Sequence, residues 1–166
     1  SRIVLTWIQP GGMVAGSTKE LKLAVDKPLP IASPWRFQKD NTGEIDLTLG
    51  ERPVFRYNAV PLLKDGLPAV QRRDAYLHPV YTPGGVLATG DFSKFHTHHR
   101  GIFLAYAKMK VKGEVVDVWN IHSAAIGGKI HHESLGTQTA GPVTAKFSAL
   151  HRWETKKGVP FLNEKW

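Results

Sequence analysis

Hydrophobic and polar side chains alternate with a period of two along most of this chain. Ile45, Leu47 and Leu49 alternate with polar neighbours, and the odd-numbered positions of residues 143–153 are mostly apolar while the even-numbered ones are mostly polar. A period of two is typical of a β-strand with one buried face. The pattern therefore predicts strands over residues 45–49, 54–57, 103–111, 115–119 and 143–153, with a return strand from residue 159.

Turn residues separate these predicted strands. Gly113 and Glu114 join residues 103–111 to residues 115–119, which predicts a hairpin. Further turns are predicted at residues 51–53 and 156–158. Residues 28–43 contain three prolines and form the loosest segment, and residues 16–25 fit a short helix and a strand equally well.

These elements predict an all-β domain, with a β-sandwich as the favoured architecture. The 166 residues suit one domain or part of a larger one, and 42% hydrophobic residues are enough to fill a core. Residues 1–50 are expected to supply the first strands and the loose segment, and residues 51–166 the sandwich region, truncated at its C-terminus. The return strand leaves an open edge, so we expect a partner chain or a further segment to complete the sheet.

Composition narrows the possible partners and chemistry. The formal net charge of +8 favours an anionic partner such as an acidic polysaccharide, nucleic acid or anionic lipid. Nucleic acid is disfavoured because the lysines are spread and no RNA- or DNA-binding motif accompanies them. No apolar run approaches the roughly 18 residues of a membrane helix. The absence of cysteine excludes disulfides, a thiolate nucleophile and cysteine-ligated metals.

Three histidines and an arginine lie within five residues: His96, His98, His99 and Arg100. The cluster follows the turn-rich residues 81–85 and precedes an apolar run, and functional sites are often built at such junctions. If the segment is extended, His96, His98 and Arg100 share one face and His99 lies on the other. If it is a loop, all three histidines can converge.

The cluster permits two chemistries. His96 and His98 could ligate zinc, copper or iron, with a third ligand from His78, His122, His131 or His132. The alternative is general acid–base catalysis, in which a histidine beside an arginine is kept neutral and acts as a base. Asp91 and Glu133 are the carboxylates available to pair with it. It is also open whether one or two of these histidines only fix the loop through backbone hydrogen bonds.

Other residues suit a sugar site. Arg73, Tyr76 and Asn120 could bind hydroxyl or carboxylate groups, whereas Trp119 is better explained by core packing. His131, His132 and Glu133 form a second cluster, which fits a solvated strand end and a functional role equally well. Neither Gly84-Gly85 nor Gly127-Gly128 is framed as a phosphate-binding loop, and no serine-hydrolase elbow or zinc-protease motif is present.

From about Phe55 to Trp166 the chain resembles a bacterial family catalogued as PmoA-like, also labelled methane oxygenase PmoA. The resemblance rests on residues 73–81 (Arg-Asp-Ala-Tyr-Leu-His-Pro-Val-Tyr), on Asp91-Phe92 and on residues 96–102 (His-Thr-His-His-Arg-Gly-Ile). Residues 93–95 depart from the family, which often has a proline and an aspartate there. The resemblance implies a supersandwich like that of galactose mutarotases, in which histidine, arginine and a carboxylate handle a sugar. The family name evokes a membrane methane oxygenase built from membrane helices, which is physically implausible for this chain because no apolar run is long enough for such a helix.

The leading hypothesis is therefore an exported bacterial protein that binds or processes carbohydrate, its acidic forms included. An enzyme of epimerase, lyase or hydrolase type is favoured over an oxygenase. His96, His98 and His99 are the candidate catalytic residues, and the candidate substrate-binding residues are Arg100, Arg73, Tyr76, His78 and Asn120. The alternatives are a metalloprotein that binds copper, zinc or iron through His96, His98 and His78, and a non-catalytic binding module.

Overall fold

A computed structural model describes residues 5–22, 32–122 and 125–166. Within these ranges the chain is all-β, with nine strands and one short 3-10 helix, η1 (Ala69–Gln71). The strands are β1 (Trp35–Lys39), β2 (Ile45–Leu49), β3 (Arg52–Asn58), β4 (Tyr76–Val80), β5 (Met109–Val111), β6 (Glu114–Val116), β7 (Lys129–Ala140), β8 (Ala145–Glu154) and β9 (Pro160–Lys165). None of the described segments is a helix long and apolar enough to span a membrane.

The strands form three antiparallel sheets. The first has the order β1-β2-β3-β4, the second is the hairpin β5-β6, and the third has the order β7-β8-β9. Ile45 of β2 pairs with Tyr57 of β3, and Tyr57 pairs with Leu77 of β4. In the third sheet His151 of β8 lies between His132 of β7 and Glu164 of β9.

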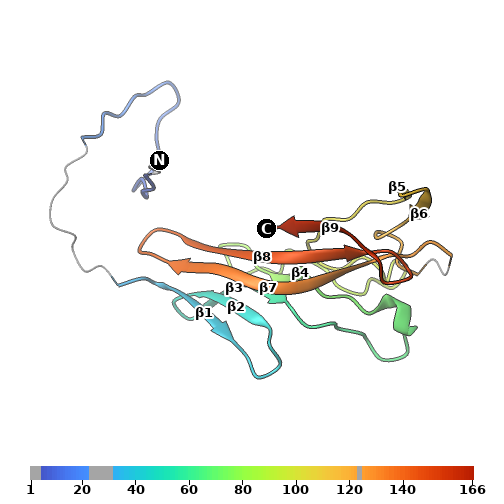
Figure 1. Cartoon of the computed structure of the whole chain (residues 1–166). Coiled ribbons are helices and arrows are strands. Elements are labelled where there is room, and N and C mark those ends of the chain that lie inside the picture. Colours follow the sequence, from blue (N-terminus) through green and yellow to red (C-terminus); the bar gives the residue numbers. More distant parts are fainter. Residues whose placement is uncertain (1–4, 23–31, 123–124) are drawn as a thin grey trace.

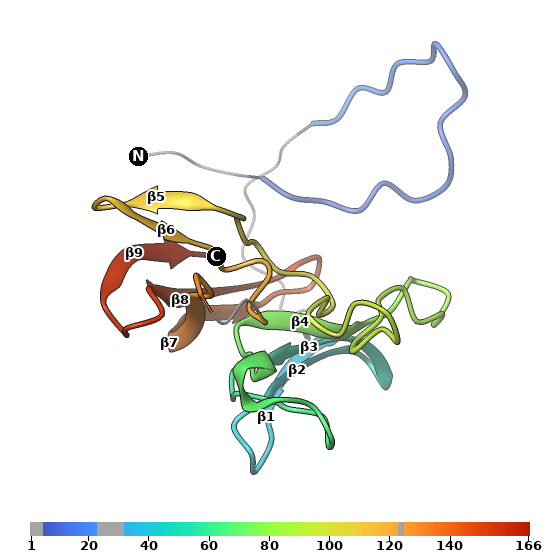
Figure 2. The same ribbon diagram turned by 90° about the vertical axis from the view of Figure 1, so that its right-hand side faces the viewer.

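The first sheet packs on one face of the third sheet, and the β5-β6 hairpin lies beside β9 (Figures 1 and 2). That face carries Phe147, Ala149, His151 and Trp153, which alternate with polar or more exposed residues as a strand requires. Ala149 packs against the first sheet, whereas Trp153 packs under the hairpin. The result is a two-layered, sandwich-like arrangement with two apolar clusters that flank His151.

Most predicted strands are confirmed. Residues 45–49 are β2, residues 54–57 lie within β3, and the long strand and its return strand are β8 and β9. The hairpin predicted around residues 113–114 joins β5 to β6. Because β3 begins at Arg52, the turn before it lies at residues 50–51 and not at 51–53.

Four predictions need correction. The loose segment contains β1, which pairs with β2 along its whole length. Only residues 109–111 of the predicted strand 103–111 are in a ladder, and the alternation of side-chain burial that begins at Phe103 is interrupted at the exposed Ala107. The strand predicted at 115–119 is shortened to β6. Residues 16–22 form neither helix nor strand, and residues 23–25 lie outside the described ranges.

Candidate functional site

The segment from residue 91 to residue 101 is a loop that is closed at its base by Asp91 and Arg100. These two residues form an antiparallel backbone bridge, and Gly101 N donates to Gly90 O at 2.9 Å. The Arg100 Nε atom also donates to Asp91 Oδ1, and Arg100 Nη2 donates to the hydroxyl of Tyr76 on β4. The backbone bridge and the ion pair together hold both ends of the histidine segment at one place on β4.

Arg100 is completely buried, which is rare for an arginine unless its charge is paired. Its Cζ atom lies 3.5 Å from the centroid of the Phe92 ring, and Nη1 approaches the carbonyl oxygens of Leu62 and Gln71 at 3.4 and 3.5 Å. The guanidinium is therefore fully occupied inside the protein. A ligand could bind it directly only if one of these contacts opened, so the structure assigns Arg100 a positioning role in the loop.

Gly101 brings the end of the loop against β4. Its φ is +47°, and a Cβ atom at this position would lie 2.0 Å from Leu77 O. The next residue, Ile102, exchanges two 2.9 Å backbone hydrogen bonds with Leu77. Only glycine fits this combination of left-handed backbone and close approach, so the Arg-Gly pair is a structural requirement of the loop.

The histidines converge because the segment is a loop and not a strand. His99 N donates to His96 O at 2.9 Å, which folds the segment into a turn. The ring centroid of His98 lies 4.4 Å from that of His99 and 5.9 Å from that of His96, and His96 and His99 stack at 4.9 Å. His122 joins them from a second loop, with its ring 4.8 Å from that of His98.

Trp119 extends this group. Asp117 Oδ1 accepts hydrogen bonds from the backbone N–H groups of Trp119 and Asn120 at 3.0 and 2.7 Å, which fixes the turn that carries the indole. Burial raises the pKa of Asp117, but the hydrogen bonds from Asn120 and Trp119 outweigh this effect and hold the pKa below its usual value. The Trp119 ring contacts His99 at 5.5 Å and is 36% exposed, so the expectation of core packing for Trp119 is wrong. We call His96, His98, His99, His122 and Trp119 the histidine face.

His98 is the least exposed histidine of this face. Burial, and then the nearby histidines and Arg73, lower the pKa of His98 to about 4. Among the described residues its ring nitrogens have no hydrogen-bond partner, and neither is closed off from solvent. A neutral imidazole with a free lone pair therefore lies at the centre of the histidine face.

The other predicted substrate-binding residues are dispersed around the loop. Arg73 is buried, donates from Nη2 to Val118 O and lies with Cζ 4.3 Å from the Phe103 ring centroid. Burial lowers the pKa of Arg73 to about 10. Tyr76 is buried beside Arg100, and the Asn120 side chain donates to Asp117 at 3.1 Å. These residues support the histidine face from beneath, and their predicted direct contact with a ligand stays a prediction.

The predicted metal set is only partly brought together. His96 and His98 are in contact, but His78 Nδ1 lies 2.9 Å from Thr89 Oγ1, and no ring contact in the described part of the chain joins it to them. Across residues 5–22, 32–122 and 125–166, no three histidine or carboxylate side chains are placed to hold one metal ion. The imidazoles meet ring to ring, whereas a metal needs three nitrogens aimed at one point about 2 Å away.

The second histidine pair lies on β7, as predicted, but its two rings have different surroundings. His131 Nδ1 is 3.7 Å from Asp74 and Nε2 is 3.6 Å from Glu154, and the hydrogen bond to Asp74 raises the pKa of His131. Burial lowers the pKa of His132, whose Nδ1 lies 2.8 Å from the Tyr57 hydroxyl. Glu133, one of the two carboxylates that could pair with a catalytic histidine, forms an ion pair with Arg152.

Sequence reasoning missed the hydrogen-bonded group to which His132 belongs. Tyr57, His151 and Glu164 are joined by hydrogen bonds inside the sandwich. The only available signal was His151 itself, a polar residue in the apolar phase of residues 143–153. Strand periodicity shows that such a side chain points inward, but it does not identify the partners that the other sheet supplies.

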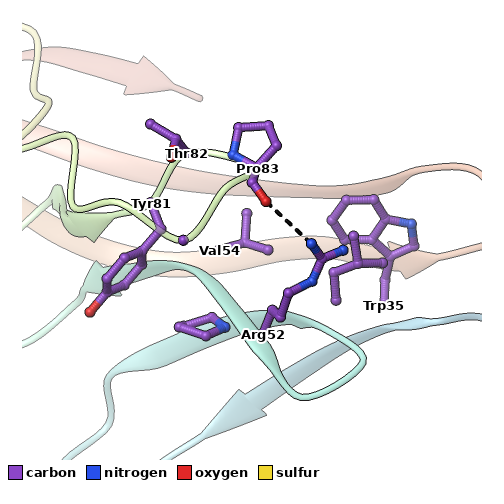
Figure 3. A pocket seen from close by; sticks show the side chains of 9 residues that line it. Trp35, Arg52, Val54, Tyr81, Thr82 and Pro83 are labelled. Carbon is purple, nitrogen blue, oxygen red and sulfur yellow. Dashed lines mark hydrogen bonds between the residues drawn. The ribbon is translucent and has the colours of Figure 1, made fainter.

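A separate hollow of about 140 Å³ lies where β1 and β3 meet the turn after β4 (Figure 3). Trp35, Val54 and Tyr81 line it, and Arg52 Nη1 donates to Pro83 O at 3.2 Å across its rim. Small-molecule pockets usually enclose roughly 300–1,000 Å³. None of the predicted site residues lines this small hollow.

Comparison with known proteins relates the chain to a family. The model of a family described as a family of unknown function (DUF6807) matches residues 44–166. No curated protein and no solved structure matches the chain. The matched region contains the histidine loop, β4 and the whole third sheet, but its description names neither an activity nor PmoA.

Proposed function

We propose that this chain, which belongs to the DUF6807 family of unknown function, binds carbohydrate at the histidine face. The observation that carries the proposal is the contact between an exposed indole and an exposed imidazole, Trp119 and His99, beside the neutral ring of His98. Sugar rings offer apolar C–H faces and a rim of hydroxyls. Aromatic rings with nearby polar nitrogens match both features.

The chemistry of His98 suits a reaction as well as binding. A neutral imidazole can accept a hydrogen bond or a proton from a hydroxyl group at pH 7. His96, His99 and His122 surround this ring and can donate or accept further hydrogen bonds. We therefore propose His98 as the acid–base residue if the bound sugar is also processed, as in an epimerase, lyase or hydrolase.

The PmoA-like resemblance, with the mutarotase-like supersandwich and exported location that go with it, belongs to this proposal. Its support is that the residues carrying the resemblance meet in space. Tyr76, Asp91 and Arg100 share one hydrogen-bonded group, and this group closes the loop that presents the histidines. The net charge of +8 favours acidic glycans among the possible ligands.

Binding is tested with a panel of neutral and uronate-containing oligosaccharides, followed by calorimetry on the best ligand. Trp119→Ala is expected to weaken binding about tenfold or more, a loss of about 1.4 kcal/mol or more. Trp7→Ala is the matched control, because Trp7 is also exposed, at 60%, but lies in the segment before β1. A protein that binds no glycan, or two variants that lose affinity equally, would count against the proposal.

Turnover is tested separately with His98→Ala. If the protein is an enzyme, we expect this variant to stay folded and to bind the glycan but to convert no substrate. If wild type binds a glycan and never converts it, the histidine face is a binding module. If His98→Ala converts substrate as fast as wild type, the assignment of His98 is wrong.

A further inference from the structure

A row of four polar side chains crosses the interior between the first and third sheets. It runs from Glu164 on β9 through His151 on β8 and Tyr57 on β3 to His132 on β7. His151 Nδ1 lies 3.1 Å from Glu164 Oε2, and the Tyr57 hydroxyl lies 2.9 Å from His151 Nε2 and 2.8 Å from His132 Nδ1. Tyr57 and His151 are fully buried, so their hydrogen-bonding groups depend on one another.

Glu164 determines the donor-to-acceptor direction of the hydrogen bonds along the row. The carboxylate accepts hydrogen bonds from two indoles, from Trp153 Nε1 at 2.9 Å and from Trp166 Nε1. Indole nitrogens only donate and an ionised carboxylate only accepts, so the third contact of Glu164 must come from a hydrogen on His151 Nδ1.

When His151 and His132 are both neutral, the positions of the remaining hydrogens in the row are determined. His151 then has a lone pair on Nε2, which accepts the Tyr57 hydroxyl hydrogen. Because the Tyr57 oxygen has given its hydrogen away, it accepts one from His132 Nδ1. His132 is left with its lone pair on Nε2.

The Nε2 atom of His132 is free to accept a hydrogen bond or a proton from a ligand. It has no hydrogen-bond partner in the described part of the chain, and it is not closed off from solvent. The backbone of His132 is fixed as well, because its N–H donates to Asp74 Oδ2 at 3.0 Å. The charged groups Asp74, Lys39 and Glu133 act on the pKa of the ring.

We propose that His132 Nε2 is the proton-accepting group of a second site, held in this tautomer by Tyr57, His151 and Glu164. The site would take a hydroxyl group: the O–H bond breaks, the proton joins Nε2, and the electron pair stays on the ligand oxygen. The new positive charge is stabilised through Tyr57 and His151 by the buried carboxylate, as a buried carboxylate orients the base in catalytic triads. The proposal uses no residue of the histidine face and goes beyond the glycan-binding function.

The tautomer can be read directly by nitrogen-15 NMR of the histidine rings at neutral pH. In the wild-type protein we expect His132 to show an unprotonated Nε2 and a protonated Nδ1. In Tyr57→Phe the Nδ1 hydrogen loses its acceptor and is expected to move to Nε2. His131, which pairs with carboxylates and does not touch Tyr57, is the internal control and should not change.

A second measurement needs no variant. Diethyl pyrocarbonate acylates neutral imidazole nitrogens, and peptide mass spectrometry locates the product. At pH 6.5 we expect His132 to react several-fold faster than His131, because burial lowers the pKa of His132 and keeps more of it neutral, whereas the hydrogen bond to Asp74 raises the pKa of His131. A wild-type His132 with its hydrogen on Nε2, or a His132 that reacts no faster than His131, overturns the proposal. The first result would mean that His151 is an imidazolium and that Tyr57 donates to His132.

Discussion

Asp91 and Arg100 are joined twice, by a backbone bridge and by a buried ion pair, at the two ends of the segment that carries His96, His98 and His99. The side chain of Arg100 is 0% exposed and that of Asp91 is 9% exposed. A buried pair of this kind stabilises little by itself, but removal of one partner leaves a charge without compensation. The pair therefore makes the presentation of the histidines depend on a contact inside the protein.

Asp91→Asn is expected to lower the free energy of unfolding by about 3–5 kcal/mol, because the Arg100 charge stays buried without its partner. Urea denaturation measures this loss. Asp46→Asn is the matched control, since it breaks the Asp46–Arg56 pair, whose side chains are about a third exposed, and should cost less than about 1 kcal/mol. An equal loss of unfolding free energy in the two variants would show that the Asp91–Arg100 pair does not hold the histidine loop closed.

Gly101→Ala is expected to destabilise the protein by roughly 2–4 kcal/mol, because a Cβ atom meets the carbonyl of Leu77 and the backbone is left-handed. We expect the histidine loop to move away from β4 and glycan binding to weaken as well. Gly90→Ala serves as the control, since open space surrounds its Cβ position and its φ is not in the left-handed region. A Gly101→Ala protein as stable as Gly90→Ala would contradict the close approach.

The two histidines of β7 should respond to pH in opposite directions. The hydrogen bond to Asp74 raises the pKa of His131 above 6.5, so its contribution to stability is present below pH 6.5 and is lost as pH rises through the folded-state value. Burial lowers the pKa of His132, so its contribution is lost as pH falls below 6.5. Wild type should thus exceed His131→Asn in stability by more at about pH 5.5 than at about pH 8.5, with the reverse trend for His132→Asn.

The metalloprotein alternative makes its own prediction, checked by elemental mass spectrometry after dialysis against a mild chelator. The ring-to-ring packing of the histidine face leads us to expect copper, zinc and iron well below one per chain. Stoichiometric metal that is lost in a His96→Ala/His98→Ala double variant would establish the alternative. It would also show that the loop rearranges to aim its nitrogens at one point.

The clustering of His96, His98 and His99 in the sequence predicts a functional segment. The sequence alone is compatible with either an extended strand or a loop for this segment. The choice of a loop depends on Asp91 and Tyr76, which bind Arg100 from elsewhere in the chain. Whether the histidine face binds glycan remains a prediction.

The sequence by itself determined the all-β class and which side chains of β2 and β8 point inward, because side-chain alternation is a local property of an extended backbone. It missed β1, since a short strand among prolines gains its stability from pairing with β2. Only the tertiary structure decided that Arg100 is buried, that Trp119 is exposed beside His99, and that His151 meets Tyr57 and Glu164. Such contacts depend on desolvation and on partners far apart in sequence, which alternation along one strand cannot specify.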